Sequence, residues 1–407
     1  MVQKILRNYK ASFSGLSSDI WWLAFITFIN RAGTMVLPFL SLYLTDYLKF
    51  SLSNVGWVMS IFGLGSLAGS WLGGKLTDKI GFYKVMVCSL LLTGLCFIGL
   101  QFASTFLEFS IGIFITMTIA DTFRPAMFVS LKAYSKPENQ TRSLTLVRMA
   151  INLGFSLGPF LGGLIISLIS YKGLFWIDGL SCIFAIIIFK TVLKEKKIST
   201  VPIEESTLKA LPKNKKRSIY NDKPYWIFLG IMFLMGFVFL QLFTTMPLFY
   251  KEVHGLTEIE IGLLMSLNGL IIFTFEMPVI HYIEKSFWNK IKLILFSMVL
   301  FSISFFILPI AWVGILVVGM VFITIAEMLA FPFTNSFAMS RSLKGKEGQY
   351  MALYAMSFSL AHVFSAKIGM EMIEKYGYNS NWFLMGILSL VAALLCVWLL
   401  KALKKSY

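Results

Sequence analysis

The sequence alternates between long apolar runs and short polar connections. Uncharged runs such as 88–107 and 293–323 are long enough to cross a bilayer, which takes about 20 apolar residues in helical form. A helix also satisfies its own backbone N–H and C=O groups, as lipid requires. The pattern predicts an all-α membrane protein with twelve transmembrane helices over residues 20–44, 52–74, 84–104, 108–132, 143–169, 173–193, 224–250, 258–283, 290–309, 311–335, 348–372 and 381–402.

The composition excludes the common soluble classes. Hydrophobic residues make up 57% of the chain and charged residues 14%, against about 25% charged in a soluble domain. The four cysteines all fall within predicted spans and lack the spacing of a metal site or a disulfide framework. No nucleotide-binding loop and no nucleophile–base pair is recognisable in the sequence. We therefore predict that the protein is not an enzyme and uses neither a metal nor an organic cofactor.

The positive charge follows the predicted topology. The chain has 36 Lys and Arg against 20 Asp and Glu, and 28 of the 36 basic residues fall in the segments on one side of the predicted membrane. Cytoplasmic segments are enriched in Lys and Arg, so both termini are predicted to be cytoplasmic. We expect a multi-pass protein of the cell membrane (the inner membrane, where a cell has two) that is monomeric. Its partners would be the lipid bilayer and a small-molecule substrate, with no nucleic acid.

The two halves of the chain are related as repeats. At a displacement of 206 residues, Asp78-Lys79 falls on Glu284-Lys285, and residues 118–121 (Thr-Ile-Ala-Asp) fall on 324–327 (Thr-Ile-Ala-Glu). A polar, basic stretch separates these halves. The predicted domains are a six-helix bundle over 1–193, a cytoplasmic linker over 194–223 and a second six-helix bundle over 224–407. Parallel repeats of this kind are a transporter architecture, with the substrate bound between the halves.

Two motifs resemble signatures of a known family. Residues 74–84 (GKLTDKIGFYK) are similar to the loop between spans 2 and 3 of the major facilitator superfamily. Residues 154–163 (GFSLGPFLGG) resemble the span 5 signature of its drug/proton antiporters. The chain as a whole resembles the bacterial twelve-span, antiporter-like branch of that superfamily. The resemblance implies the major facilitator fold, in which two six-helix bundles are related by pseudo-symmetry and spans 1, 4, 7 and 10 line the central cavity.

The resemblance also implies mechanical roles for these motifs. A carboxylate at the cytoplasmic end of span 2 can accept hydrogen bonds from a helix N-terminus, which the family places at span 11. The implied conformational latch comprises Gly74, Asp78, Lys79 and Gly81. The span 5 motif forms a stripe of small residues that lets helices approach closely in lipid. The implied helix-packing residues are Gly154, Gly158, Pro159, Gly162 and Gly163.

Ionisable residues inside the spans are the strongest candidates for function, because charge in the hydrocarbon layer is costly and usually faces a cavity or a partner. The candidates for proton coupling are Glu327, Asp121 and Glu276. Asp121 has Arg124 one helical turn away and is expected to stay ionised. Glu327 has no basic residue within a turn and is expected to take up and release a proton more readily. For Asp178, Lys367 and Glu371, nearer the outer face, snorkelling or structural pairing is expected.

The substrate-cavity candidates are Asn30, Arg31, Arg124, Gln241 and Phe331. Drug antiporters usually carry an arginine in the outer half of span 4, where this chain has Ile113. The basic residues are instead Arg31 and Arg124, and their positions are compatible with an anionic substrate. Residues 30–44 resemble span 1 of proton-coupled peptide transporters, without the acidic residues that precede the arginine there.

The sequence thus predicts a secondary active transporter that exports amphipathic or drug-like small molecules by alternating access, with the proton as coupling ion. Two alternatives stay open. The first is proton-coupled uptake of peptides or other carboxylate-bearing substrates, and the second is a lipid flippase.

Overall fold

The computed structural model describes residues 15–136, 139–196, 219–285, 289–342 and 347–404. These residues form helices and connecting turns, with no strand among them. The first half contains α2 (Ser18–Ala32), α3 (Val36–Leu42), the π-helical η1 (Tyr43–Tyr47), α4 (Leu52–Ile80), α5 (Phe82–Leu100), α6 (Phe106–Ala120), α7 (Phe123–Tyr134), α8 (Gln140–Leu168) and α9 (Tyr171–Val192). The second half contains the 3₁₀ turn η4 (Ile219–Asn221), α10 (Lys223–Phe239), α11 (Gln241–Thr244), α12 (Met246–Glu252), α13 (Glu258–Lys285), α14 (Lys290–Ile307), α15 (Gly314–Arg341) and α16 (Glu347–Lys404).

The helices form twelve membrane spans, although only eleven separate stretches of the described residues have the required length and hydropathy. The last stretch contains two spans. The 58 residues of α16 would be about 87 Å long as one straight helix, nearly three times the thickness of the hydrocarbon layer. Gly377, with φ 82° and ψ 171°, breaks this helix where the sequence predicts a connection between the eleventh and twelfth spans. The predicted helix count and fold class are confirmed.

Spans 1, 4 and 7 are interrupted, which the apolar pattern does not reveal. Span 1 breaks between α2 and α3, span 4 breaks at Asp121-Thr122 between α6 and α7, and span 7 consists of α10, α11 and α12. At the break in span 1, the backbone N–H groups of Met35 and Val36 donate to Asp178 of span 6 at 2.8 and 3.1 Å. A buried carboxylate thereby satisfies the start of α3, where unpaired N–H groups would be costly. Of the two roles expected for Asp178, snorkelling or structural pairing, the structure shows a structural contact.

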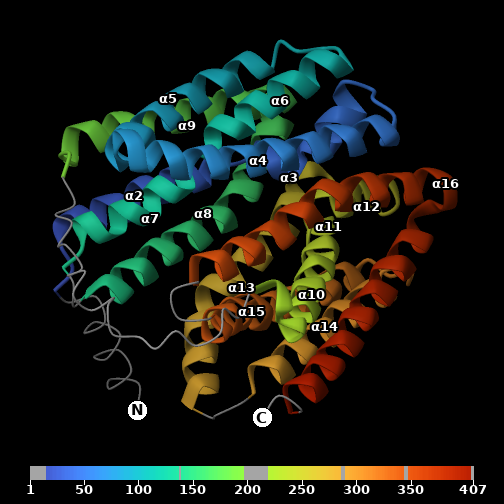
Figure 1. Ribbon diagram of the computed structural model, residues 1–407. Coiled ribbons are helices and arrows are strands. Elements are labelled where there is room, and N and C mark those ends of the chain that lie inside the picture. The colour runs from blue at the N-terminus through green and yellow to red at the C-terminus, as the bar shows by residue number, and fades with distance from the viewer. Residues whose placement is uncertain (1–14, 137–138, 197–218, 286–288, 343–346, 405–407) are drawn as a thin grey trace, which may run out of the picture.

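The two six-helix groups contact each other at one end and diverge toward the other (Figure 1). We call the end that contains Ser18 and Lys404 the proximal end and the opposite end the distal end. Two helix pairs, α8 with α13 and α4 with α16, make the main contacts between the halves. In the second pair, Lys367 donates to the Ser53 hydroxyl at 2.7 Å and pairs with Glu371 at 2.9 Å. The structural pairing predicted for Lys367 and Glu371 is confirmed.

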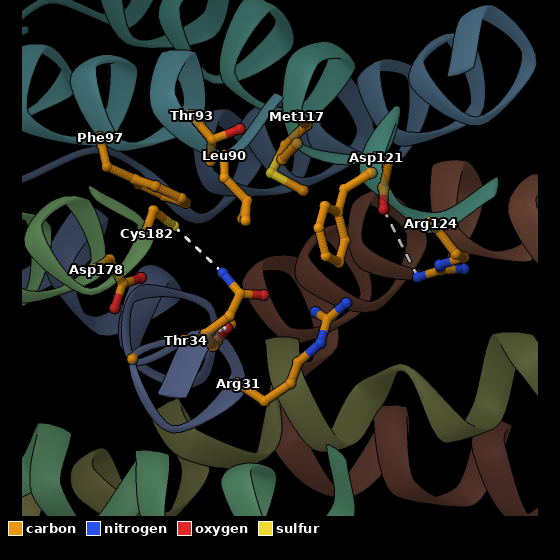
Figure 2. A pocket seen from close by; sticks show the side chains of 14 residues that line it. Arg31, Thr34, Leu90, Thr93, Phe97, Met117, Asp121, Arg124, Asp178 and Cys182 are labelled. Atoms are coloured by element: carbon orange, nitrogen blue, oxygen red, sulfur yellow. Dashed lines mark hydrogen bonds and ion pairs between the residues drawn. The ribbon is translucent and has the colours of Figure 1, made fainter. Parts of the chain in front are cut away.

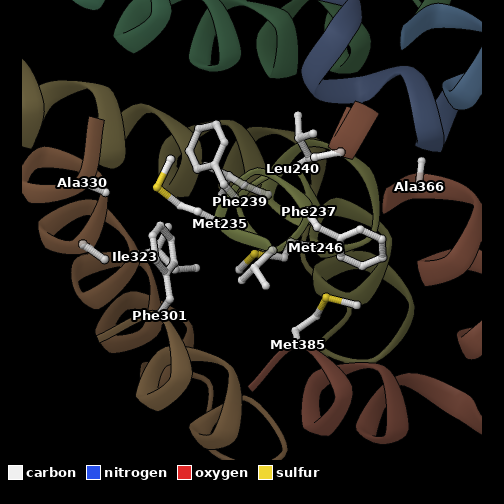
Figure 3. Packing of buried hydrophobic residues seen from close by; sticks show 14 of the residues in the cluster. Met235, Phe237, Phe239, Leu240, Met246, Phe301, Ile323, Ala330, Ala366 and Met385 are labelled. Atoms are coloured by element: carbon white, nitrogen blue, oxygen red, sulfur yellow. The ribbon is translucent and has the colours of Figure 1, made fainter. Parts of the chain in front are cut away.

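Aromatic and methionine side chains fill the interior of the second half. Figure 3 shows side chains of α10, α12, α14, α15 and α16 packed around the interrupted span 7, among them Phe239, Met246, Phe301 and Met385. These flexible and planar side chains fill the irregular space that a broken helix leaves. The proposed domain boundaries at 193 and 224 stay predictions, and residues 197–218 of the linker lie outside the described residues.

The glycines of span 5 permit two different close contacts. Gly154, Gly158 and Gly162 face span 1, where an added Cβ would lie 2.5 Å from Arg31 Cβ, 3.2 Å from the Thr34 carbonyl oxygen and 2.9 Å from the Phe39 ring, respectively. Gly163 instead packs against the Glu258 carbonyl at the start of span 8. Pro159 remains inside the continuous helix α8, and its carbonyl packs against Gly262 of span 8. The motif therefore contacts span 1 on one side and the other half of the molecule on the other.

We expect Gly163→Ala to weaken the distal contact between the halves. A methyl group at this position would overlap the Glu258 backbone, which cannot move without span 8, and such overpacking costs about 1–3 kcal/mol. Spin labels at distal positions in the two halves should report longer distances by double electron–electron resonance. Gly99→Ala is the matched control, because nothing lies within 4 Å of its added Cβ and Gly99 belongs to none of the predicted motifs. Unchanged distances in Gly163→Ala would show that this contact does not hold the distal end closed.

Candidate functional site

A polar cavity of about 80 Å³ lies inside the first half, among spans 1, 3, 4 and 6 (Figure 2). It brings together four of the residues predicted from the sequence: Asn30, Arg31, Asp121 and Arg124. Asp121 stands at the break in span 4, where its side chain is within reach of span 2. The Ser66 hydroxyl donates to Asp121, and Arg124 Nη2 lies 3.7 Å from Asp121 Oδ1. Asn30 donates to Cys182 Sγ at 3.4 Å.

Two cations line this cavity, and Arg31 has fewer partners for its charge than Arg124. Among the residues that the structure describes, no carboxylate lies within ion-pair distance of its guanidinium, and its buried Nε has no hydrogen-bond partner. Its guanidinium carbon lies 5.5 Å from the centre of the Phe155 ring. An aromatic face stabilises a cation without neutralising it. The cavity therefore carries a positive charge that an anionic group could balance.

A second cavity, of about 260 Å³, lies between the two halves. It brings together Glu276, Glu327 and Phe331 of the predicted site, and the first half contributes Arg148 and Asn152 from span 5. Arg148 pairs with Glu276 at 2.9 Å, and Asn152 donates to the other oxygen of Glu276 at 3.1 Å. Glu276 belongs to the second half, and both of its partners belong to the first half.

Glu327 has a different environment from Glu276, although both line the same cavity. Its Oε2 accepts a hydrogen bond from Asn268 Nδ2 of span 8 at 2.9 Å, and Asn268 also donates to Thr324 at 3.1 Å. None of the described basic residues lies within ion-pair distance of Glu327. An amide can bond to the ionised or to the protonated acid, whereas an arginine favours only the ionised form. The arrangement leaves Glu327 able to change its protonation state.

Three phenylalanines form the apolar side of the cavity between the halves. The Phe331 ring centre lies 5.0 Å from that of Phe239 and 5.7 Å from that of Phe358. With both carboxylates ionised, the polar side carries two negative charges against the single positive charge of Arg148. This combination suits a molecule with a polar or cationic group and an apolar body.

Several residues in or beside these cavities were not singled out from the sequence as site residues. Asn268 and Ser66 contact the two candidate carboxylates, while Arg148 and Asn152 bridge the halves. One signal was present for Asn268, since it is the only amide side chain in the uncharged run 261–273. Its partner could not be read from that run, because Glu327 is 59 residues away on another span.

The structure places Gln241 outside both cavities. Its fully buried amide donates to the carbonyl and hydroxyl oxygens of Ser365 at 3.1 and 2.9 Å and accepts from Thr245 at 2.6 Å. These bonds attach the interrupted span 7 to span 11 within the second half. In this structure Gln241 therefore packs helices together, and its predicted place in a substrate cavity stays a prediction.

The predicted latch residues lie at the proximal end, where the halves are apart. Asp78 and Lys79 are exposed at the end of α4, and neither has a hydrogen bond or ion pair with any described residue. Gly81 has φ 87° in the turn to α5, a conformation that favours glycine. An added Cβ at Gly74 would meet open space. Residues 343–346, which precede the predicted partner span 11, lie outside the described residues, so the role of these four residues as a latch stays a prediction.

A charged cluster closes the distal end. Lys251 of span 7 lies 2.6 Å from Asp46 of span 1 and 2.5 Å from Glu258 of span 8. The Tyr171 hydroxyl of span 6 lies 2.9 Å from Glu258 and 3.1 Å from Lys251. The cluster therefore joins both halves, each of which supplies one acid. In the adjacent loop, burial lowers the pKa of His254, so this histidine is neutral at pH 7 and adds no charge.

Comparison with known proteins identifies the family. A sequence model of the Major Facilitator Superfamily matches residues 20–366. The chain belongs to this superfamily. "Uncharacterized MFS-type transporter YttB" of Bacillus subtilis is 24% identical over 90% of this chain and 90% of its own length. "Multidrug resistance protein MdtH" of Aeromonas salmonicida is 24% identical over 66% of this chain and 65% of its own.

Solved structures of this fold are also similar. The crystal structure of a POT family transporter in complex with a thioalcohol-conjugated peptide has a TM-score of 0.79 at 16% identity, covering 96% of this chain and 97% of that one. The resemblance to the major facilitator superfamily is confirmed. The protein is a multi-pass major facilitator transporter and, as predicted, not an enzyme.

We expect Lys251→Gln to open the distal end of this major facilitator transporter. Removal of the cation leaves Asp46 and Glu258 facing each other across the halves, and two uncompensated carboxylates repel. Cysteines placed in the distal half of the central cavity should react faster with a water-soluble maleimide. Lys49→Gln is the control, since Lys49 is exposed at the same end and takes no part in the cluster. Equal reactivity in both variants would contradict a closing role for Lys251.

Proposed function

We propose that this major facilitator transporter exports amphipathic, drug-like small molecules in exchange for protons. The observation that carries the proposal is the cavity between the halves. There Glu327 has no cationic partner among the described residues, and it lies beside the Arg148–Glu276 pair and a wall of phenylalanines. A proton carrier must be a group that changes its protonation state, and a cavity shared by both halves can present it to either side of the membrane.

The membrane-facing groove beside this cavity supports an amphipathic substrate. A groove of about 520 Å³ runs between spans 1 and 5 and is lined by apolar side chains, including Trp21, Phe28 and Leu153, with Phe273 of span 8 completing it. Phe273 lies one helical turn from Glu276, and Leu153 follows Asn152, so the groove adjoins the polar side of the cavity. A molecule with an apolar body can occupy the groove while its polar group remains near the carboxylates.

The proposed cycle uses the two ends of the molecule alternately. In the proposed orientation both termini are cytoplasmic and the distal end faces outward. The cluster of Lys251, Asp46, Glu258 and Tyr171 then closes the cavity to the outside. In this state Glu327 releases its proton to the cytoplasm and substrate enters. Opening of the distal end releases substrate outside and lets Glu327 bind a proton. Closure of the proximal end engages Asp78 with span 11. In the proposed cycle a monomer in the bilayer is sufficient, because one chain supplies the distal cluster, Glu327 and Asp78.

Glu327→Gln tests proton coupling. Glutamine mimics the protonated acid, so we expect uphill, proton-driven efflux of an amphipathic dye from proteoliposomes to be abolished while dye exchange at equal pH persists. Asp121→Asn is the comparison variant, and it should impair both activities, because it removes the acid that faces Arg124 and Arg31 at membrane depth. Uphill transport that persists in Glu327→Gln would exclude Glu327 as the proton carrier and direct attention to Glu276.

A second candidate function, proton-coupled transport of carboxylate-bearing substrates such as peptides, is favoured by Arg31. Its guanidinium has no carboxylate partner in the described structure and lines the polar cavity, and the planar fork of an arginine binds a carboxylate through two hydrogen bonds. The similar POT family structure contains a peptide conjugate, as its name states.

The two candidate functions are separated by Arg31→Lys, which keeps the charge and loses the fork. Under the second function, transport of a dipeptide should fall by more than tenfold while transport of a cationic dye is unchanged, as measured in the same proteoliposomes. Equal loss for both substrates would make Arg31 a structural residue.

A further inference from the structure

A third polar cavity lies away from the transport pathway, at the proximal end of the second half. It has a volume of about 340 Å³ and is bounded by the start of α14, the end of α15 and the end of α16. These three helix ends meet where the spans leave the hydrocarbon layer. The cavity therefore faces the region of the lipid headgroups, and the cavity residues do not overlap with those of the two cavities described above.

The lining divides into a basic side and an apolar side. Arg341 and Lys404 are the charged residues, and Asn289 and Ser340 add polar groups. Phe337, Leu400 and Leu403 make up the remainder. Cations beside an apolar wall at a membrane boundary match the two parts of an anionic phospholipid, whose phosphate adjoins its acyl chains.

Asp222 fixes the guanidinium of Arg341 and leaves some of its N–H donors unused. Its Nε and Nη2 bond to the two oxygens of Asp222 at 3.0 and 2.8 Å, and the Tyr350 hydroxyl also donates to Asp222 at 3.0 Å. A guanidinium has five N–H donors, so three remain after the bidentate bond to Asp222. The side chain of Arg341 is 24% exposed, which leaves the remaining donors accessible. Its orientation is thus fixed before any ligand arrives.

Lys404 supplies the net charge. It is exposed, and no carboxylate of the described residues lies within ion-pair distance of it. Since Asp222 balances Arg341, the site as a whole carries one positive charge. At Asn289, Oδ1 accepts from the backbone N–H groups of Ile291 and Lys292 at 2.9 and 3.4 Å. The Nδ2 group of Asn289 is its remaining donor.

We propose that this cavity binds the headgroup of an anionic phospholipid. The phosphate contacts Arg341 and Lys404, and the start of an acyl chain lies along Phe337, Leu400 and Leu403. Asp222 is also the N-cap of α10, where its side chain accepts from Tyr225 N–H at 3.2 Å. A bound lipid therefore stabilises the junction of α10, α15 and α16 at which the second half begins.

Lys404→Gln tests the site, because this exposed residue can be changed without breaking a contact of the fold. Purified full-length protein in phosphatidylcholine nanodiscs would be titrated with phosphatidylglycerol of the same acyl chains, and bound lipid would be counted by native mass spectrometry after release. We expect Lys404→Gln to bind phosphatidylglycerol about fivefold more weakly, the factor typical of one basic residue near an anionic surface. The thermal stabilisation by phosphatidylglycerol should shrink in parallel.

Lys401→Gln is the matched control, since it removes the same charge from an exposed position of the same helix that does not line the cavity. Its phosphatidylglycerol affinity should equal that of the unchanged protein. Equal weakening in both variants would show a diffuse attraction to anionic lipid and overturn the proposal, as would no weakening in either. Inorganic phosphate is the second arm. Stabilisation of the protein by phosphate as large as that by phosphatidylglycerol would identify a free-phosphate site and overturn the lipid assignment.

Discussion

An ionised side chain inside the hydrocarbon layer needs a partner, and this constraint organises the structure of the transporter. Asp178 bonds to the N–H groups that begin α3, Lys367 pairs with Glu371, and Glu276 pairs with Arg148. Each partner comes from another span or from the next turn of the same helix. The bonds of Asp178 hold span 6 against span 1, and the Arg148–Glu276 pair holds span 5 against span 8, so these ionisable groups fix how the spans around the cavities are arranged.

The partners also explain why the halves separate at one end alone. At the distal end, the Lys251 cluster and the glycine contacts of spans 5 and 8 join the halves through polar groups and backbone packing. At the proximal end, the ion pairs Lys196–Asp19 and Arg341–Asp222 of the described residues each stay within one half. A rocking motion can therefore break one set of contacts and leave the internal structure of each half intact.

The cavity between the halves gives the transporter its chemical character. Two carboxylates share this cavity, but Arg148 satisfies only Glu276, and a neutral amide accompanies Glu327. Because Arg148 and Asn152 belong to the first half, the ionisation of Glu276 also stabilises the contact between the halves. Under the proposed antiport, the same atoms therefore link the charge of the cavity to the conformation of the transporter.

The sequence by itself determined the properties that depend on local periodicity. Span lengths, the 206-residue repeat and the family motifs are all visible in one dimension, and so are pairs one turn apart, such as Asp121 with Arg124 and Lys367 with Glu371. The tertiary structure alone decided which spans meet and how each is rotated. Arg148 and Glu276 are 128 residues apart and Met35 and Asp178 are 143 apart, and no pattern along the chain encodes those distances. For the same reason Gln241, a polar residue in a cavity-lining span, turned toward Ser365 within its own half. A rotation of about 100° per residue moves a side chain from a cavity to a helix contact, and packing against neighbouring helices is what sets that rotation.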